Sequence, residues 1–138
     1  MQQRTTRVPA VASELSALRQ FMGAFWSEQG LSEPALFPFD LALEEVFTNI
    51  VMHGLPPAGD LVEVSLALEE GRVTLCIADG GPAFDPLQEA PAPDLDADLD
   101  ARSIGGLGVF LVKELMDTVT YQYRDRKNVL TMSKRVDA

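Results

Sequence analysis

The chain is poor in cross-linking and metal-binding side chains. Its 138 residues include one cysteine, Cys76, and one histidine, His53. A single cysteine cannot close an internal disulfide or build a cysteine metal cluster. Cys76 lies in an alternating apolar pattern, so we expect a small packing residue in a reducing compartment.

The chain also lacks long apolar runs and an excess of positive charge. Nowhere do about 18 apolar residues follow one another, as a membrane-spanning helix requires, and residues 1–10 lack the apolar core of a signal peptide. The formal net charge is −10. This charge disfavours a general nucleic-acid or anionic-membrane binder, because both need a basic face, but it allows a local cationic pocket for phosphate. We expect a cytoplasmic protein without a direct nucleic-acid or membrane partner.

Two stretches in the first half of the chain have the apolar spacing of helices. After a short strand at 4–8, Ser13 is a predicted cap for a helix that ends at Gly30, and a second helix begins near Pro38 and ends at Gly54. Apolar residues recur at intervals of three and four in both stretches. They are Leu15, Leu18, Met22 and Phe25 in the first, and Phe39, Leu43, Val46 and Ile50 in the second.

The remaining patterned segments predict strands and one more helix. Alternating apolar residues at 62–68 and 73–77 flank Glu70-Gly71 and indicate a hairpin. A third helix follows, and strands at 118–123 and 129–136 are joined by a polar turn at 124–128. The length fits a single domain, 1–138. We therefore predict an α+β fold: a two-layer α/β sandwich with a mixed, mostly antiparallel sheet covered on one face by three helices.

Residues 79–103 have no periodicity and consist largely of Gly, Pro, Ala and Asp. An unpatterned stretch of this length inside a compact domain is usually functional or disordered. Two interpretations remain open: a solvated loop, or a mobile lid at about 86–104 that becomes ordered when a ligand binds.

Glu45, Asn49 and His53 are spaced four apart, so they share one stripe of the second helix. The neutral oxygen of an asparagine suits Mg²⁺, and an unliganded carboxylate one turn away can accept a proton from a hydroxyl. The alternative is an ordinary polar surface stripe. Glu44 points about 100° away and is expected in solvent, and His53 is most simply a residue of the helix C-terminus.

Asp79 follows a strand and shares its odd-numbered parity with the apolar residues at 73, 75 and 77. In an extended strand it therefore faces the layer between sheet and helices. A buried carboxylate needs a donor, and the exocyclic amine of adenine is a suitable one; a turn contact or a helix cap is the structural alternative. Gly80 and Gly81 would let a flat ring approach the backbone.

The cluster Gly105-Gly106-Leu107-Gly108 begins the third helix. Helix N-termini favour anions, and glycines there cost stability, so phosphate binding with hinge motion is one explanation. A close crossing of helix and sheet is the other. Arg102 is a candidate partner for phosphate oxygens, although a surface arginine among aspartates is equally compatible.

Three segments of the chain together resemble a known family. Residues 41–54 (LALEEVFTNIVMHG) resemble the N box of the GHKL (Bergerat-fold) ATPases, residues 79–86 (DGGPAFDP) the first glycine box, and residues 105–113 (GGLGVFLVK) the second. The short length, with Phe-Asp-Pro at 84–86 and Leu-Met-Asp at 115–117, is most similar to the stand-alone anti-sigma-factor serine-protein kinases.

The resemblance implies a Bergerat ATP-binding fold and a protein kinase that uses ATP and Mg²⁺. Such a kinase phosphorylates a serine on a STAS-type anti-sigma antagonist, captures a sigma factor when that antagonist is absent, and forms a homodimer. Three alternatives remain open: a nucleotide-binding switch protein of the same fold with little or no kinase activity, the less favoured ATPase module of a sensor histidine kinase, and an interaction domain that binds no nucleotide and carries an acidic loop.

By position, the resemblance makes Glu45 the general base, Asn49 the magnesium ligand and Asp79 the adenine acceptor. The nucleotide-binding glycines are Gly81, Gly105, Gly106 and Gly108, with Leu107 and Arg102 beside them. Ala83 stands where many relatives carry another glycine, which predicts a stiffer loop on the adenine side.

Overall fold

The computed structural model describes residues 1–53, 61–89 and 106–136. Within them, five strands form one sheet in the order β1-β2-β3-β5-β4, and each neighbouring pair is antiparallel. The expected sheet, mixed and mostly antiparallel, is thus antiparallel at every described pairing. The strands are β1 Gln2–Pro9, β2 Leu61–Glu69, β3 Arg72–Asp79, β4 Thr118–Arg124 and β5 Lys127–Arg135.

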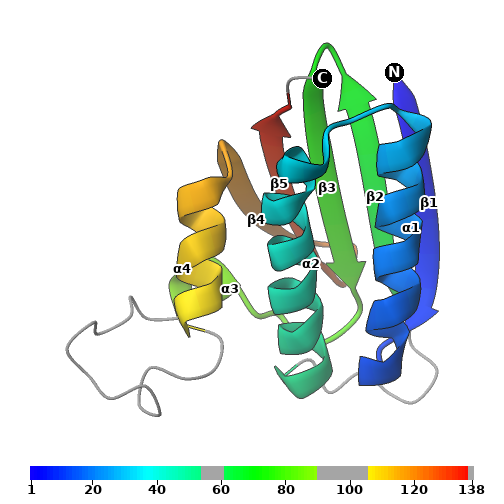
Figure 1. The fold of residues 1–138 in the computed structure, drawn as a ribbon. Helices are drawn as coiled ribbons and strands as arrows, with labels where there is room; N and C mark the ends of the chain where they lie inside the picture. Colours follow the sequence, from blue (N-terminus) through cyan, green and yellow to red (C-terminus); the bar gives the residue numbers. More distant parts are fainter. Residues whose placement is uncertain (54–60, 90–105, 137–138) are drawn as a thin grey trace.

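Three helices cover one face of this sheet: α1 (Leu15–Glu28), α2 (Glu33–His53) and α4 (Gly106–Leu115) (Figure 1). A single 3₁₀ turn, Ala12–Glu14, precedes α1, and a one-turn helix, α3 (Pro86–Glu89), follows β3. The predicted two-layer α+β architecture is confirmed. Among the described residues, no helix is both long enough and apolar enough to cross a membrane.

The core lies between the two layers, where the apolar face of the strands meets the apolar faces of the helices. Alternate residues of β2 and β3 point to the helices and are buried, and so are the predicted apolar faces of α1 and α2, with Leu15 only partly so. Burying a side chain of this size contributes about 1.5–3 kcal/mol, so the layers are held chiefly by this contact. Phe25, Phe39, Phe47, Leu18, Met22, Leu66, Leu75 and Ile77 are among the largest fully buried side chains.

The ends of α1 agree only in part with the sequence prediction. Gly30 has a φ of 66°, and the N–H groups of Gly30 and Leu31 donate to the carbonyls of Ser27 and Trp26, so a Schellman motif ends the helix as expected. Ser13 is not the cap. It lies inside the 3₁₀ turn, and α1 follows Glu14 without a side-chain capping bond, because the chain is already helical before the capping position.

The second helix is longer than predicted, since α2 begins at Glu33 and not near Pro38. Pro34 occupies its first turn, where no intrahelical N–H bond is lost. Pro38 lies inside the helix and is buried. The next residue, Phe39, is fully buried and packs its ring at a tilt of 53° against Trp26, with ring centroids 5.2 Å apart.

Both described hairpins have two-residue turns with positive φ. Glu70 and Gly71 have φ of 51° and 78°, which confirms the predicted turn between β2 and β3. Asp125 and Arg126 have φ of 52° and 61° between β4 and β5. The polar turn predicted at 124–128 is therefore too long, and Asn128 belongs to β5.

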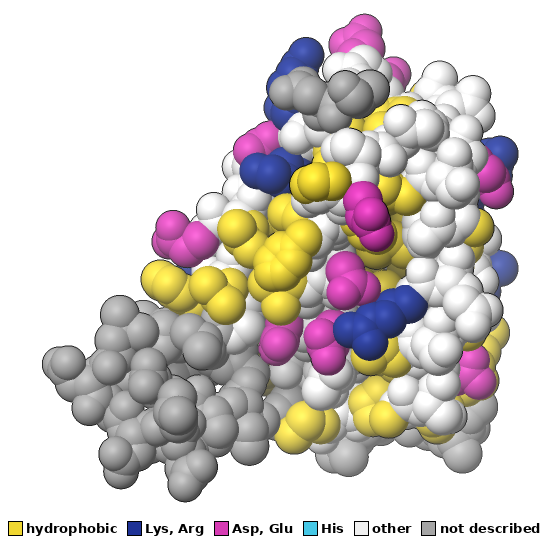
Figure 2. Space-filling model, in the orientation of Figure 1, with side chains coloured by type: hydrophobic (Ala, Val, Ile, Leu, Met, Phe, Trp, Pro, Cys, Tyr) yellow, Lys and Arg dark blue, Asp and Glu magenta, His cyan; other side chains and the backbone are white. Residues whose placement is uncertain are grey.

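The helical face of the molecule carries charge and apolar surface in different places. Figure 2 shows acidic side chains along α2 and hydrophobic side chains gathered where α4 lies. On α2, Asp40 and Glu44 both pair with Arg19 of α1, at 3.1 and 3.0 Å. Leu111 of α4 is exposed. The expectation that Glu44 points toward solvent is thus confirmed, with Arg19 as its partner.

Candidate functional site

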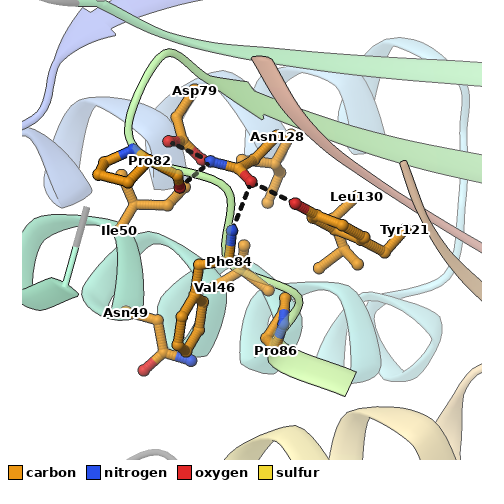
Figure 3. Close-up of a pocket in the computed structure, with 11 residues that line it drawn as sticks. Val46, Asn49, Ile50, Asp79, Pro82, Phe84, Pro86, Tyr121, Asn128 and Leu130 are labelled. Carbon is orange, nitrogen blue, oxygen red and sulfur yellow. Dashed lines mark hydrogen bonds between the residues drawn. The ribbon is translucent and has the colours of Figure 1, made fainter. Parts of the chain in front are cut away.

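A pocket lies between α2, the loop after β3, and strands β4 and β5 (Figure 3). Its walls are largely apolar and its volume is about 40 Å³. Small-molecule pockets usually measure about 300–1,000 Å³, so a ring the size of a purine needs a wall residue to move. Among the wall residues, Pro82 is exposed and Phe84 is half-buried. The lining residues are Val46, Asn49, Ile50, Ile77, Asp79, Pro82, Phe84, Pro86, Tyr121, Asn128 and Leu130.

Asp79 is the buried carboxylate of this pocket. It is the last residue of β3 and only 7% exposed, as its parity predicted. Its Oδ1 accepts hydrogen bonds from the Gly81 N–H at 2.9 Å and from the Asn128 carboxamide at 3.2 Å, so the turn contact considered as the alternative is also present. Within the described chain, Oδ2 has no hydrogen-bond partner. A buried oxygen without a donor is costly, which makes Oδ2 a candidate acceptor for a ligand amine.

Asn128 is a site residue that the sequence prediction missed. It lies directly opposite Asp79 in the pairing of β3 with β5. Its Nδ2 donates to the Asp79 carboxylate and to the carbonyls of Gly81 (3.3 Å) and Pro82 (2.9 Å). Its Oδ1 accepts the Phe84 N–H at 2.9 Å and the Tyr121 hydroxyl. The sequence signal for Asn128 was its alternation with Leu130 and Met132. The predicted turn at 124–128 included Asn128 and so concealed this signal.

Asn49 lies at the far side of the same pocket. It projects from α2 between the buried Val46 and Ile50. Figure 3 shows its carboxamide pointing away from the pair formed by Asp79 and Asn128. The pocket thus has a carboxylate at one end, an amide at the other and apolar walls between them, an arrangement that suits a flat apolar ring with polar groups at both ends.

Glu45 lies one turn before Asn49 but is not part of the pocket lining. Its carboxyl group packs on the backbone of α4 at Gly108. A Cβ built on Gly108 would be 2.0 Å from the Glu45 carboxyl carbon and from Oε2. Burial, and to a smaller extent the charge of Glu44, raise the pKa of Glu45 above its ordinary value of 4.5. The polar stripe is therefore divided: Asn49 faces the pocket and Glu45 faces α4.

The other predicted site residues belong to the glycine-rich segments. Gly81 is buried and its N–H binds Asp79. Gly106 and Leu107 are the first residues of α4, as predicted. Arg102 and Gly105 lie outside the described residues, so their predicted roles stay predictions.

The predicted lid begins in described structure. Pro86–Glu89 forms α3, which Asp85 caps by accepting the Leu87 N–H at 2.9 Å. Proline at the first position of this helix loses no intrahelical bond. Residues 90–104 of the predicted lid lie outside the described residues.

Comparison with known proteins gives one family match. The model of the histidine kinase-like ATPase domain matches residues 8–134. The chain is 39% identical over 99 residues to the serine/threonine-protein kinase BtrW of Bordetella bronchiseptica, an alignment that covers 70% of this chain and 68% of that relative. It is 30% identical over 135 residues to the serine-protein kinase RsbW of Staphylococcus aureus, covering 94% and 84%.

Among solved structures, the chain resembles the RsbU and RsbW domains of Rv1364c from Mycobacterium tuberculosis. The TM-score is 0.71 at 15% identity, and the match covers 99% of this chain. The chain spans 33% of the length of that solved chain. At this identity the likeness shows a shared fold.

Proposed function

Because the chain belongs to the histidine kinase-like ATPase family, we propose that it is an ATP-dependent serine-protein kinase that acts on a STAS-type anti-sigma antagonist and also binds a sigma factor. The kinase class is supported by the relatives named as serine-protein kinases. The single observation that carries the proposal is the buried Asp79 carboxylate at the end of an apolar pocket, with Oδ2 unpartnered within the described chain.

The pocket fits the adenine end of ATP in its chemistry. Ile50, Ile77 and Leu130 give apolar surface for a flat ring. Asp79 accepts a hydrogen bond from the exocyclic amine, because an ionised carboxylate has acceptors only. A purine with an oxygen in place of that amine would set two acceptors against each other.

The opposite end of the pocket suits the phosphates. We assign Mg²⁺ to the side-chain oxygen of Asn49, since hard cations prefer oxygen ligands and Mg²⁺ is commonly shared with substrate phosphates. Gly106 at the start of α4 lies where backbone N–H groups and the helix dipole favour an anion. When bound, ATP supplies the phosphoryl group for the serine and leaves as ADP, while Mg²⁺ offsets the phosphate charge.

Glu45 is the proposed general base. Its carboxylate accepts the proton of the serine hydroxyl as the serine oxygen bonds to phosphorus. A raised pKa makes a carboxylate a stronger base. The pKa of Glu45 is raised in this sense by burial and by Glu44.

The proposed partners are proteins. The antagonist and the sigma factor come from the likeness to the serine-protein kinases, and we propose a homodimer on the same basis; sedimentation measures that assembly directly. We propose that the partner protein docks on the helical face, where Leu111 of α4 is exposed.

The test is calorimetric titration with Mg-ATP. The wild-type protein should bind, and Asp79→Asn should weaken binding by about 10- to 100-fold, since a hydrogen bond to a charged group contributes roughly 1.5–3 kcal/mol. Asp117→Asn is the control, because Asp117 pairs with Arg72 at the other end of β3. Absence of heat with the wild-type protein would reject the nucleotide assignment. Binding without transfer of radiolabelled phosphate to a STAS-domain protein would favour a switch protein without kinase activity.

A further inference from the structure

The Asn128 carboxamide has its hydrogen-bonding capacity fully used by the protein. It makes five polar contacts, three through Nδ2 and two through Oδ1. A carboxamide has two N–H donors and two acceptor lone pairs. Two donors therefore serve three acceptors, and both lone pairs of Oδ1 are occupied. Asn128 has nothing left to offer a ligand, although it lines the pocket.

The contacts of Asn128 hold the loop after β3 from both sides of Ala83. Nδ2 donates to the Pro82 carbonyl at 2.9 Å, and Oδ1 accepts the Phe84 N–H at 2.9 Å. Ala83 is exposed. Loops are usually more mobile than the elements they connect, but one buried side chain of β5 fixes this loop at two neighbouring peptide groups. Figure 3 shows these bonds converging on Asn128.

The same side chain also decides which oxygen of Asp79 is available. Asn128 and the Gly81 N–H both donate to Oδ1, at 3.2 and 2.9 Å. Two donors on one oxygen leave the other without a partner within the described chain. The pocket consequently presents a carboxylate acceptor and, from Asn128, no donor.

We propose that Asn128 is a positioning and specificity-determining residue for the nucleobase. It holds the loop at 81–84 against the pocket and occupies Oδ1 of Asp79, so that Oδ2 selects a purine with an amine at position 6 over one with a carbonyl there. This inference rests on the proposed function, because it concerns the same pocket.

A purely structural role for Asn128 makes a different prediction. It would stabilise the hairpin and the loop without changing the choice between amine and carbonyl. The test therefore compares ATP with inosine triphosphate, which differs by a carbonyl in place of the amine, and follows the loop without nucleotide through exchange of the Phe84 amide hydrogen.

Two variants separate the two functions of the carboxamide. Asn128→Asp keeps the shape and the acceptor for the Phe84 N–H but removes both donors and sets a second carboxylate beside Asp79. It should reduce ATP affinity at least tenfold and lower the ATP-to-inosine-triphosphate affinity ratio, while the Phe84 amide stays protected. Asn128→Ala should lower the ratio and also speed exchange of that amide.

Thr131→Val is the matched control, because Thr131 lies in the same strand, does not line the pocket and bonds Cys76 instead. It should keep the wild-type affinity ratio. An unchanged ratio in both Asn128 variants, with wild-type ATP binding intact, would overturn this inference and leave the proposed function standing. Faster exchange in Asn128→Ala with an unchanged ratio would also overturn it, in favour of the structural role. If the wild-type protein binds neither nucleotide, both proposals fall together.

Discussion

The two ends of the candidate site are built in different ways. At the proposed nucleobase end, Asp79 and Asn128 are held by a network of hydrogen bonds between β3, β5 and the loop that follows β3. At the contact between α2 and α4, the Glu45 carboxyl group lies on the backbone of Gly108. No hydrogen bond or ion pair from the described residues holds that carboxyl group.

This difference suggests that the two regions have different roles in binding and in catalysis. Hydrogen bonds within a sheet fix positions before a ligand arrives, which suits recognition. A carboxylate held only by packing on a neighbouring helix moves when that helix moves, and α4 begins next to the predicted lid. We therefore expect changes at the nucleobase end to alter affinity and changes at the contact of α2 with α4 to alter rate.

The largest expected effect comes from Glu45→Gln. General bases contribute about 10²- to 10⁴-fold to rate, so phosphate transfer to a STAS-domain protein should fall by that factor. The affinity for Mg-ATP should stay near the wild-type value, because Glu45 does not line the pocket. Single-turnover transfer of radiolabelled phosphate and calorimetry measure the two quantities. Unimpaired transfer would remove Glu45 from the role.

Glu44→Gln is the control one residue away, since Glu44 is half-exposed and paired with Arg19. Glu45→Gln should also remain folded at neutral pH. A carboxyl group whose pKa is raised in the folded state binds its proton more tightly there, so its ionisation lowers stability as pH rises above 4.5. Removing the charge should not reduce the free energy of unfolding through this cause, and thermal unfolding of the two variants checks it.

A smaller effect is expected from Gly108→Ala. The new Cβ would lie 2.0 Å from the Glu45 carboxyl group, so that flexible side chain must move. Misplacing a reacting group by about 1 Å can cost 10²-fold, so kcat should fall by up to that factor with little change in the KM for ATP. Gly23→Ala is the matched control in α1, with nothing within 4 Å of the new Cβ. A lower affinity for ATP with an unchanged kcat would indicate instead that Gly108 contacts the phosphates.

The position of Asp79 in the fold was easier to predict than the contact of Glu45 with Gly108, because the signals for Asp79 are local. Alternation at 73, 75 and 77 placed Asp79 on the inner face, and the structure buries it there. The sequence prediction missed Asn128 because Asp125 and Arg126 adopt positive φ without the glycine or asparagine that usually marks such a turn. With the turn drawn too long, the pairing of Asn128 with Asp79 could not be inferred.

The contact between Glu45 and Gly108 has no local signal at all. The spacing of Glu45 and Asn49 correctly placed both on one stripe of a helix. Which side of that stripe meets α4 depends on how two distant helices pack on the sheet. Similarly, α2 starts at Glu33 and continues through Pro38, which is buried together with Phe39. This tertiary packing overrides the usual preference of proline for the first turn of a helix.

The smallest expected effect concerns the pH dependence of transfer. Glu45 must be ionised to accept a proton, and its pKa is raised by burial first and by the charge of Glu44 second. The rate of the wild-type protein should therefore fall on acidification at a pH above the ordinary 4.5 of a glutamate. Glu44→Gln removes only the second cause. The acid limb of the pH–rate profile should therefore move to lower pH, while the rate on the plateau at neutral pH is unchanged. Because burial remains, the limb should not reach the ordinary value. The Asn128 variants change the nucleobase end and should leave the limb in place at saturating ATP; a shift in those variants would mean that the two ends are coupled.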